Sequence, residues 1–252
     1  MSLVFYLSIA LQIACAAHVV RSGRPLYWIW LILIGSYLAV LVYVLIAVIP
    51  DLRHDPRGRS ATRKVLQTID PQRRRRELQR RLELANTAEN RRHLATECLQ
   101  QGDYENAEEL YRGLLSGMYA SEPEFMLGLA QAQAGVGNHA AARSTLENLI
   151  QANPGFRSSE GHLLYARCLE ALGETEAALH EYQVLADSYP GEEGRYRYAC
   201  MLSKVQRQPE ARDILQTQLK RAKLMPSYYR RKEQAWLKAA RLELSRLGER
   251  GA

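Results

Sequence analysis

The chain has 252 residues, which is long enough for one repeat domain of moderate size beside a second segment, and its formal net charge is +7. That total hides a segregation, because residues 86–203 carry 8 Lys and Arg against 17 Asp and Glu, whereas residues 204–252 carry 13 against 5. The four cysteines form no C-x-x-C pair, so their spacing excludes a zinc ribbon and is atypical of a disulfide framework. We expect them to be small buried hydrophobes.

Two uncharged stretches, residues 3–20 and 26–49, lie at the start of the chain and are separated by the segment from Arg21 to Pro25. A helix of about 20 apolar residues crosses the hydrocarbon core of a membrane. So short a connection forces two such helices to run antiparallel, and we expect residues 1–50 to form a transmembrane hairpin. A cleaved signal peptide ending near Cys15 is the alternative for the first stretch, although no basic residue precedes its apolar run.

The basic residues on either side of the second stretch predict its orientation. The connection carries Arg21 and Arg24, whereas five cations follow the second stretch closely: Arg53, Arg57, Arg59, Arg63 and Lys64. Basic residues are enriched in cytoplasmic loops. We therefore expect an integral protein of the inner (plasma) membrane of a bacterium, with the remainder of the chain in the cytoplasm.

The predicted hairpin also carries a pattern of its own, since Arg24-Pro25 precedes Trp28 and Tyr43 lies further along the second stretch. In these positions it resembles the two-helix segment at the N-terminus of phospholipase D-type enzymes such as cardiolipin synthases. Ser36 and Ala39 replace the Pro and Gly that this family usually carries between them. The resemblance implies a membrane anchor and no catalysis, because the H-x-K-x-x-x-x-D signature of those enzymes is missing.

A basic linker, residues 51–85, follows the hairpin. Prolines 56 and 71 prevent a long helix in its first half, but Gln72 onward has good helix formers, with Leu78 and Leu82 at helical spacing. The arginines at 73–76, 80 and 81 have two explanations, which are contact with anionic lipid headgroups and a topology signal on a solvated spacer. A nucleic-acid role is disfavoured, because no aromatic residues are interleaved with the arginines.

The longest pattern covers residues 86–226, where small and large apolar residues recur in step. Alanines form two columns with identical intervals of 35, 36 and 33 residues, and a tyrosine or leucine follows each second-column alanine by four positions. A leucine lies three positions further on in the first three units, whereas Gln218 departs from the rule in the fourth. Alanine allows close approach of two helices. We expect these alanines to pack the helix pairs: Ala95, Ala107, Ala130, Ala142, Ala166, Ala178, Ala199 and Ala211.

A period near 34 residues, split by Gly102-Asp103, Gly137-Asn138 and Gly173-Glu174, resembles the tetratricopeptide repeat (TPR) family. The resemblance implies an all-α fold in which helix pairs stack into a solenoid. The expected units are residues 86–120, 121–156, 157–191 and 192–226. Residues 227–252 are expected to form one C-terminal capping helix, with an apolar face comprising Tyr228, Trp236, Ala239, Leu242 and Leu247.

In the TPR family the first helix of each unit lines a concave groove that faces a partner. The resemblance therefore implies groove positions on all four units: Glu89, Arg92, Thr96, Glu124, Leu127, Gln131, Glu160, Leu163, Arg167, Glu193, Tyr196 and Cys200. The four glutamates occupy equivalent positions, and such a row would favour a basic or polar peptide. The alternative is that each glutamate only complements the dipole of its helix. The Lys and Asn clamp with which some family members hold a chaperone tail is not reproduced.

Residues 135–140 match the dinucleotide pattern G-x-G-x-x-A, but no strand precedes them and they fall between two predicted helices. Glycine is expected to end the first of these helices and Asn138 to cap the second. We find no P-loop, nucleophile elbow or zinc-protease motif. We therefore expect no enzymatic activity, no metal or cofactor site, and no small-molecule substrate.

Two functions are consistent with the sequence. The favoured one is a non-catalytic scaffold, anchored in the membrane, that binds a protein or peptide partner at its cytoplasmic face. The alternative is an accessory or regulator of a membrane lipid or envelope enzyme that associates with phospholipid directly.

Overall fold

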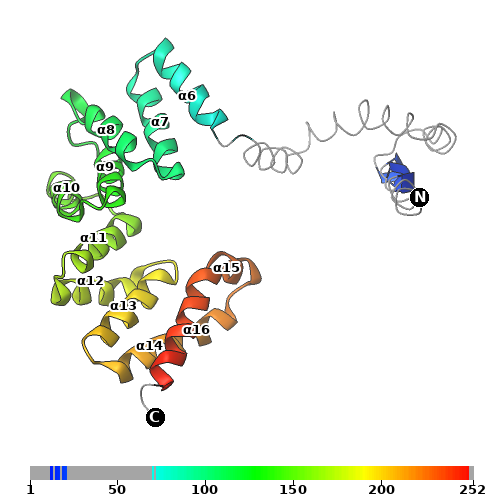
Figure 1. Cartoon of the computed structure of the whole chain (residues 1–252), viewed down its shortest axis with the longest axis vertical. Helices are drawn as coiled ribbons and strands as arrows, with labels where there is room; N and C mark the ends of the chain where they lie inside the picture. The colour runs from blue at the N-terminus through cyan, green and yellow to red at the C-terminus, as the bar shows by residue number, and fades with distance from the viewer. Residues whose placement is uncertain (1–11, 14, 18, 22–69, 71, 250–252) are drawn as a thin grey trace. The chain divides into compact units, whose positions relative to one another are not determined.

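The computed structural model describes residues 12–13, 15–17, 19–21, 70 and 72–249. From Arg73 onward the described chain is entirely helical, and its helices follow one another with short connections (Figure 1). Their bounds are α6 Arg73–Leu84, α7 Ala88–Gln101, α8 Tyr104–Leu114, the 3-10 turn η2 Gly117–Tyr119, α9 Pro123–Val136, α10 His139–Ala152, α11 Ser159–Ala171, α12 Thr175–Ser188, α13 Glu193–Lys204, α14 Gln208–Leu224, α15 Ser227–Lys232 and α16 Gln234–Glu249.

The chain divides between Arg73 and Arg74 into two units, and the second unit, Arg74–Ala252, is described here by itself. Its hydrophobic clusters draw their buried residues from positions between Leu78 and Leu247. Because these clusters, as far as the described residues go, contain no residue of the first unit, residues 70–252 are expected to fold on their own.

The predicted transmembrane stretches, residues 3–20 and 26–49, lie outside the described residues except for a few positions between 12 and 20. In the part of the chain that the structure describes, no helix combines the length and the apolar character needed to cross a bilayer.

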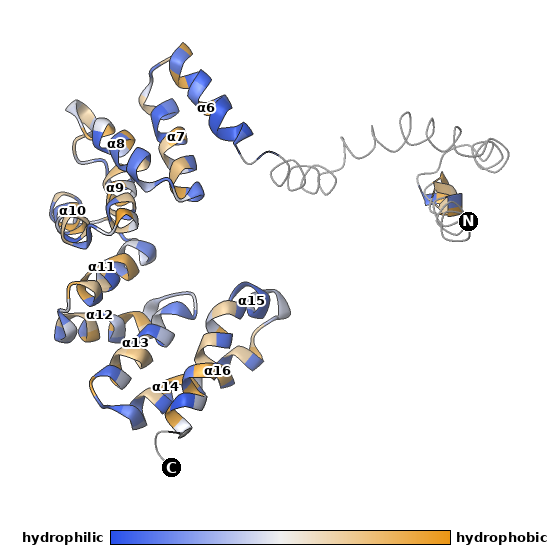
Figure 2. Cartoon of the chain, viewed as in Figure 1, coloured by the Kyte–Doolittle hydropathy of each residue, from blue (hydrophilic) through white to orange (hydrophobic). Residues whose placement is uncertain are grey.

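Four helix pairs, α7/α8, α9/α10, α11/α12 and α13/α14, form a curved stack in which each pair packs against the next (Figure 1). All eight column alanines have an exposed fraction of 0 %. Their lack of bulk lets the helix backbones approach, and the larger neighbours Tyr111, Leu146, Tyr182 and Leu215 fill the space beside each contact and are themselves buried. Figure 2 shows that hydrophilic and hydrophobic residues are interspersed along these helices.

The first three pairs turn at a glycine with positive φ, namely Gly102, Gly137 and Gly173, whereas Gln206 takes this conformation in the fourth pair. Gly137, with φ of 94°, ends α9 in the left-handed conformation that favours glycine, and the Asn138 side chain accepts a hydrogen bond from the Ala141 amide at the start of α10. The G-x-G-x-x-A match therefore lies on the turn of a helix pair. Pro154 and Pro190 follow the ends of α10 and α12, as their lack of an amide donor requires.

The contact between α8 and α9 depends on a glycine. A Cβ atom at Gly128 would lie 2.4 Å from Cζ of Tyr111, whose ring is buried and whose hydroxyl is 3.0 Å from that of Thr96. We predict that Gly128→Ala lowers the free energy of unfolding by about 1–2 kcal/mol, because overpacking outweighs the gain in helix propensity. Urea denaturation of residues 70–252 measures this. Gly113→Ala is the control, since only the far end of the Arg91 side chain is near its Cβ, and it should not destabilise.

Glu170 on α11 joins three helices. It accepts hydrogen bonds from Lys204 Nζ at 2.6 Å and the Tyr182 hydroxyl at 2.8 Å, and Arg197 Nη1 lies 3.5 Å away. Burial opposes its charge, but the bonds from Lys204 and Tyr182 and the nearby cations outweigh burial and lower the pKa of Glu170 below its ordinary value of 4.5.

A lowered pKa in the folded state stabilises the fold above the unfolded pKa, and this stabilisation is lost as pH falls through the folded value. We therefore predict that the wild-type chain is more stable than Glu170→Gln by a constant margin above about pH 5, and that the margin shrinks as pH falls further. Thermal melting of both proteins across this range measures the margin. A margin that does not change with pH would refute the role of the Glu170 charge.

The C-terminal segment differs from the prediction of one helix over residues 227–252. The chain is divided at Glu233 into α15 and α16, because the Glu233 carboxylate is directed inward and accepts a hydrogen bond from the Glu192 amide at 3.0 Å. The predicted apolar face is also wrong in part, since Tyr228 is 73 % and Leu242 is 56 % exposed. The apolar side chains that the structure buries in this segment are Leu237, Ala240 and Leu247.

Helix α16 occupies the place that the first helix of a fifth unit would take. It packs against α14 and α13, just as α9 packs against α8 and α7. Ala240, with an exposed fraction of 0 %, lies 41 residues after Ala199. The spacing exceeds the repeat interval because the six residues of α15 are inserted before α16.

The lead-in helix α6 packs on the first pair through Leu78, which is buried. Two of its arginines pair with acidic residues of the repeats, since Arg74 Nε lies 2.9 Å from Glu97 and Arg75 Nη1 lies 2.6 Å from Asp103. Part of the basic run therefore fixes α6 to the acidic repeats, a role that neither of the two explanations from the sequence included.

Candidate interaction surface

The predicted groove positions on the first three units lie on α7, α9 and α11. Glu89, Glu124 and Glu160 are all in the first turns of these helices, and the side chains of Glu89 and Glu124 are 75 % and 68 % exposed. Arg92 Nη1 lies 4.0 Å from Glu124, so neighbouring first helices place these predicted residues next to each other.

Other predicted positions contribute to this surface to different degrees. Arg167 is exposed, whereas Arg92, Thr96, Leu127 and Gln131 are half-buried. We call the residues on α7, α9 and α11 the first-helix surface, which comprises Glu89, Arg92, Thr96, Glu124, Leu127, Gln131, Glu160 and Arg167.

Leu163 does not belong to the surface, in contrast to the prediction. Its exposed fraction is 5 %, and it belongs to the core cluster that also contains Tyr182 and Ala199. Leu127 is packed against Gly161, whose Cβ position lies 3.3 Å from a Leu127 methyl carbon. These apolar side chains therefore join one unit to the next. The exposed part of the first-helix surface consists of its polar residues.

The fourth unit does not continue the surface, because α16 covers it. The Tyr196 ring has its centroid 5.6 Å from that of Trp236 on α16, and the Arg197 guanidinium lies 5.6 Å from the Trp236 ring. Glu193 is paired with Arg197 at 2.7 Å and is 15 % exposed. Glu193 and Tyr196 therefore serve the packing of α16, and only three of the four predicted glutamates remain available to a partner. Cys200, also on α13, is half-buried.

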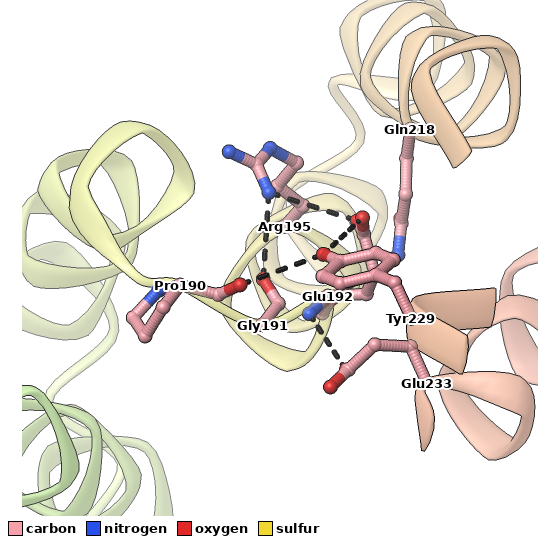
Figure 3. Close-up of polar contacts among 7 residues, drawn as sticks. All are labelled: Pro190, Gly191, Glu192, Arg195, Gln218, Tyr229 and Glu233. Atoms are coloured by element: carbon pink, nitrogen blue, oxygen red, sulfur yellow. Dashed lines mark hydrogen bonds and ion pairs between the residues drawn. The ribbon is translucent and has the colours of Figure 1, made fainter. Parts of the chain in front are cut away.

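A buried polar cluster behind the fourth unit was not predicted (Figure 3). Glu192 is 1 % exposed, accepts a hydrogen bond from the Tyr229 hydroxyl at 2.8 Å, and has Arg195 at 3.6 Å. Gln218, with an exposed fraction of 0 %, donates from Nε2 to the Glu192 carbonyl at 3.1 Å. The cluster attaches α15 and α16 to α13 and α14. The only sequence signal was Gln218 in a column of leucines.

Two properties of the described residues bear on catalysis, namely metal ligation and the reactivity of the cysteine thiols. Within them, no three or more His, Cys, Asp or Glu side chains gather in an arrangement that could hold a metal ion. Burial is the largest cause of the raised pKa values of the Cys98, Cys168 and Cys200 thiols. These thiols are therefore protonated at neutral pH and are poor nucleophiles.

Comparison with known proteins agrees with the helix-pair architecture. The sequence profile described as tetratricopeptide repeat matches residues 99–155 and 134–202. A thermophilic TPR protein of Thermus thermophilus superposes with a TM-score of 0.51 at 19 % identity, over 71 % of this chain and 96 % of that chain. YrrB, a TPR protein with an unusual peptide-binding site, gives 0.48 at 16 % identity, over 69 % of this chain and 89 % of that chain. No match was found among curated protein sequences. This chain therefore contains tetratricopeptide repeats, stacked as an all-α solenoid.

Proposed function

We propose that the repeats form a non-catalytic scaffold that binds a basic or polar peptide segment of another protein. The observation that carries this proposal is the row of exposed glutamates on successive first helices, Glu89, Glu124 and Glu160. Carboxylates spaced along one surface attract cationic side chains and accelerate their association at low salt. The alternative, that each glutamate complements the dipole of its own helix, requires no partner. It treats the three glutamates separately and gives no reason for them to form a row.

Selection from a random-sequence peptide display library against residues 70–252 tests this proposal. We predict that the selected peptides are rich in Lys and Arg and that their affinity falls by about tenfold or more in the triple variant Glu89→Gln, Glu124→Gln and Glu160→Gln, as a loss of roughly 0.5 kcal/mol or more per charge implies. The control is the triple variant Glu105→Gln, Glu109→Gln and Glu176→Gln, which removes the same charge from exposed positions on α8 and α12. Equal losses of peptide affinity in both variants would show that the first-helix surface is not a specific binding site.

We further propose that the scaffold is anchored in a membrane by residues 1–50, with the repeats in the cytoplasm. The support is the length and lack of charge of residues 3–20 and 26–49, together with the basic residues that follow them. An alkaline phosphatase reporter, which is active only outside the cytoplasm, can be fused to the C-terminus. The anchor predicts that the full chain remains in carbonate-washed membranes and that the reporter is inactive, and high reporter activity would contradict the orientation.

A further inference from the structure

A cleft of about 520 Å³ lies between the end of α14 and the α15–α16 pair, away from the first-helix surface. We call it the cap cleft. Apolar side chains form part of its lining, including Leu219 and Leu237, and four cations surround them: Lys223, Arg230, Arg231 and Arg241.

Among residues 72–249, no acidic side chain pairs with the cations of the cap cleft. Residues 214–242 contain eight Lys and Arg and one acidic residue, Glu233, which is 6 % exposed and bound to the Glu192 amide. Among the described residues, no carboxylate lies within ion-pair distance of any of the four cleft cations. Arg230 instead donates from Nη1 to the Lys223 carbonyl at 3.1 Å, which holds its charge at the end of α14.

The basic run of α6 provides a contrast. Arg74 is paired with Glu97 and Arg75 with Asp103, so acidic side chains of the repeats neutralise part of the charge of α6. The cations of the cap cleft have no such partners in the described part of the chain, and Figure 2 shows α15 as one of the most hydrophilic segments of the unit. A ligand for this site must therefore be anionic.

Exposed apolar side chains beside the cleft indicate which class of anion it binds. Leu224, the last residue of α14, is 87 % exposed, and Tyr228, in the first turn of α15, is 73 % exposed. They are close in sequence to Lys223 and Arg230. Cations flanked by exposed apolar and aromatic side chains suit a lipid interface, where the charges bind phosphates and the apolar groups enter the boundary below the headgroups. An RNA ligand would use the cations but would leave Leu224 in water.

We propose that the cap cleft and the adjoining Leu224 and Tyr228 dock on a bilayer that contains anionic phospholipid. The lipid phosphate is bound by Arg230, Arg231 and Lys223, and the apolar floor faces the glycerol and acyl region. This proposal rests on the proposed membrane anchor, which would keep the repeats close to a bilayer. Docking through the cap cleft would hold the C-terminal end of the solenoid at the bilayer.

The test measures sedimentation of residues 70–252 with phosphatidylcholine vesicles that contain or lack phosphatidylglycerol. We expect binding only with phosphatidylglycerol, and a loss of about 30-fold in the double variant Arg230→Gln and Arg231→Gln, since each basic residue near the surface contributes about 1 kcal/mol. The control, Arg112→Gln with Arg157→Gln, removes two exposed cations from the repeats and should lose less than about threefold. Leu224→Ser should weaken binding without changing the net charge.

Three results would overturn the proposal: binding that ignores phosphatidylglycerol, equal losses in the two double variants, and binding of poly(U) RNA through Arg230 and Arg231 without binding to vesicles. Circular dichroism of each variant confirms that it is folded. The fragment lacks residues 1–69, so failure of lipid binding is distinct from failure of the anchor. Selection of basic peptides on the same fragment reports the scaffold function separately.

Discussion

Tyr182→Ala is expected to lower the free energy of unfolding of residues 70–252 by about 3–5 kcal/mol, the range for removing a large aromatic side chain from a core. Tyr182 has an exposed fraction of 0 % and belongs to the largest core cluster, which joins the third and fourth units to α16. Its hydroxyl also donates to Glu170 at 2.8 Å. Alanine would leave a cavity between α12 and its neighbours and remove that bond.

Urea denaturation followed by circular dichroism measures the effect. Val184→Ala is a matched control on the same helix, because Val184 is 45 % exposed, and it should cost less than about 1 kcal/mol. If the two substitutions cost the same, α12 would not be the centre of the core that the structure describes.

Glu192→Ala is expected to cost about 3–5 kcal/mol, because it removes one partner of a buried ion pair and leaves the other uncompensated. The side chain of Arg195 is 9 % exposed and has Glu192 at 3.6 Å. The Tyr229 hydroxyl would lose the carboxylate that lies 2.8 Å away (Figure 3). The loss should appear first as faster hydrogen exchange in α15 and α16, since these helices are attached through the cluster.

Gln218→Leu is the contrasting substitution in the same cluster. It restores the leucine that the first three units carry at this position and removes an amide whose Oε1 atom is buried without a hydrogen bond. The Glu192 carbonyl keeps the Tyr196 amide as a donor at 3.2 Å. The stability of Gln218→Leu should therefore equal or exceed that of the wild type. A loss as large as that of Glu192→Ala would mean that the Gln218 amide is as important to the attachment of α15 and α16 as the ion pair.

The helix pairs could be predicted because their signal is local and repeated. A close contact between two helices requires a small residue at the same position of every unit. Alanines at intervals of 35, 36 and 33 residues therefore identify the units without knowledge of the fold. The turn at Gly137 and Asn138 was predictable for the same reason, because chain reversal and capping depend on adjacent residues.

The features that could not be predicted depend on contacts between distant residues. Glu233 divides the last helix because it bonds to the Glu192 amide, and no local pattern near Glu233 indicates that partner. The position of Leu163 in its repeat predicts an open surface, whereas its burial depends on side chains of α12 and α13. The pairing of α6 with the repeats had a signal, namely a basic segment beside an acidic one, but its geometry did not follow from charge alone.

The proposed scaffold function requires that a partner bind along the first helices of the repeats. Hydrogen exchange of residues 70–252, with and without a selected basic peptide, measures this most directly. We expect protection to be concentrated in α7, α9 and α11, in the segments that carry Glu89, Glu124 and Glu160, and to be absent in the Glu-to-Gln triple variant. Protection confined to α8, α10 and α12, or to the cap, would contradict it.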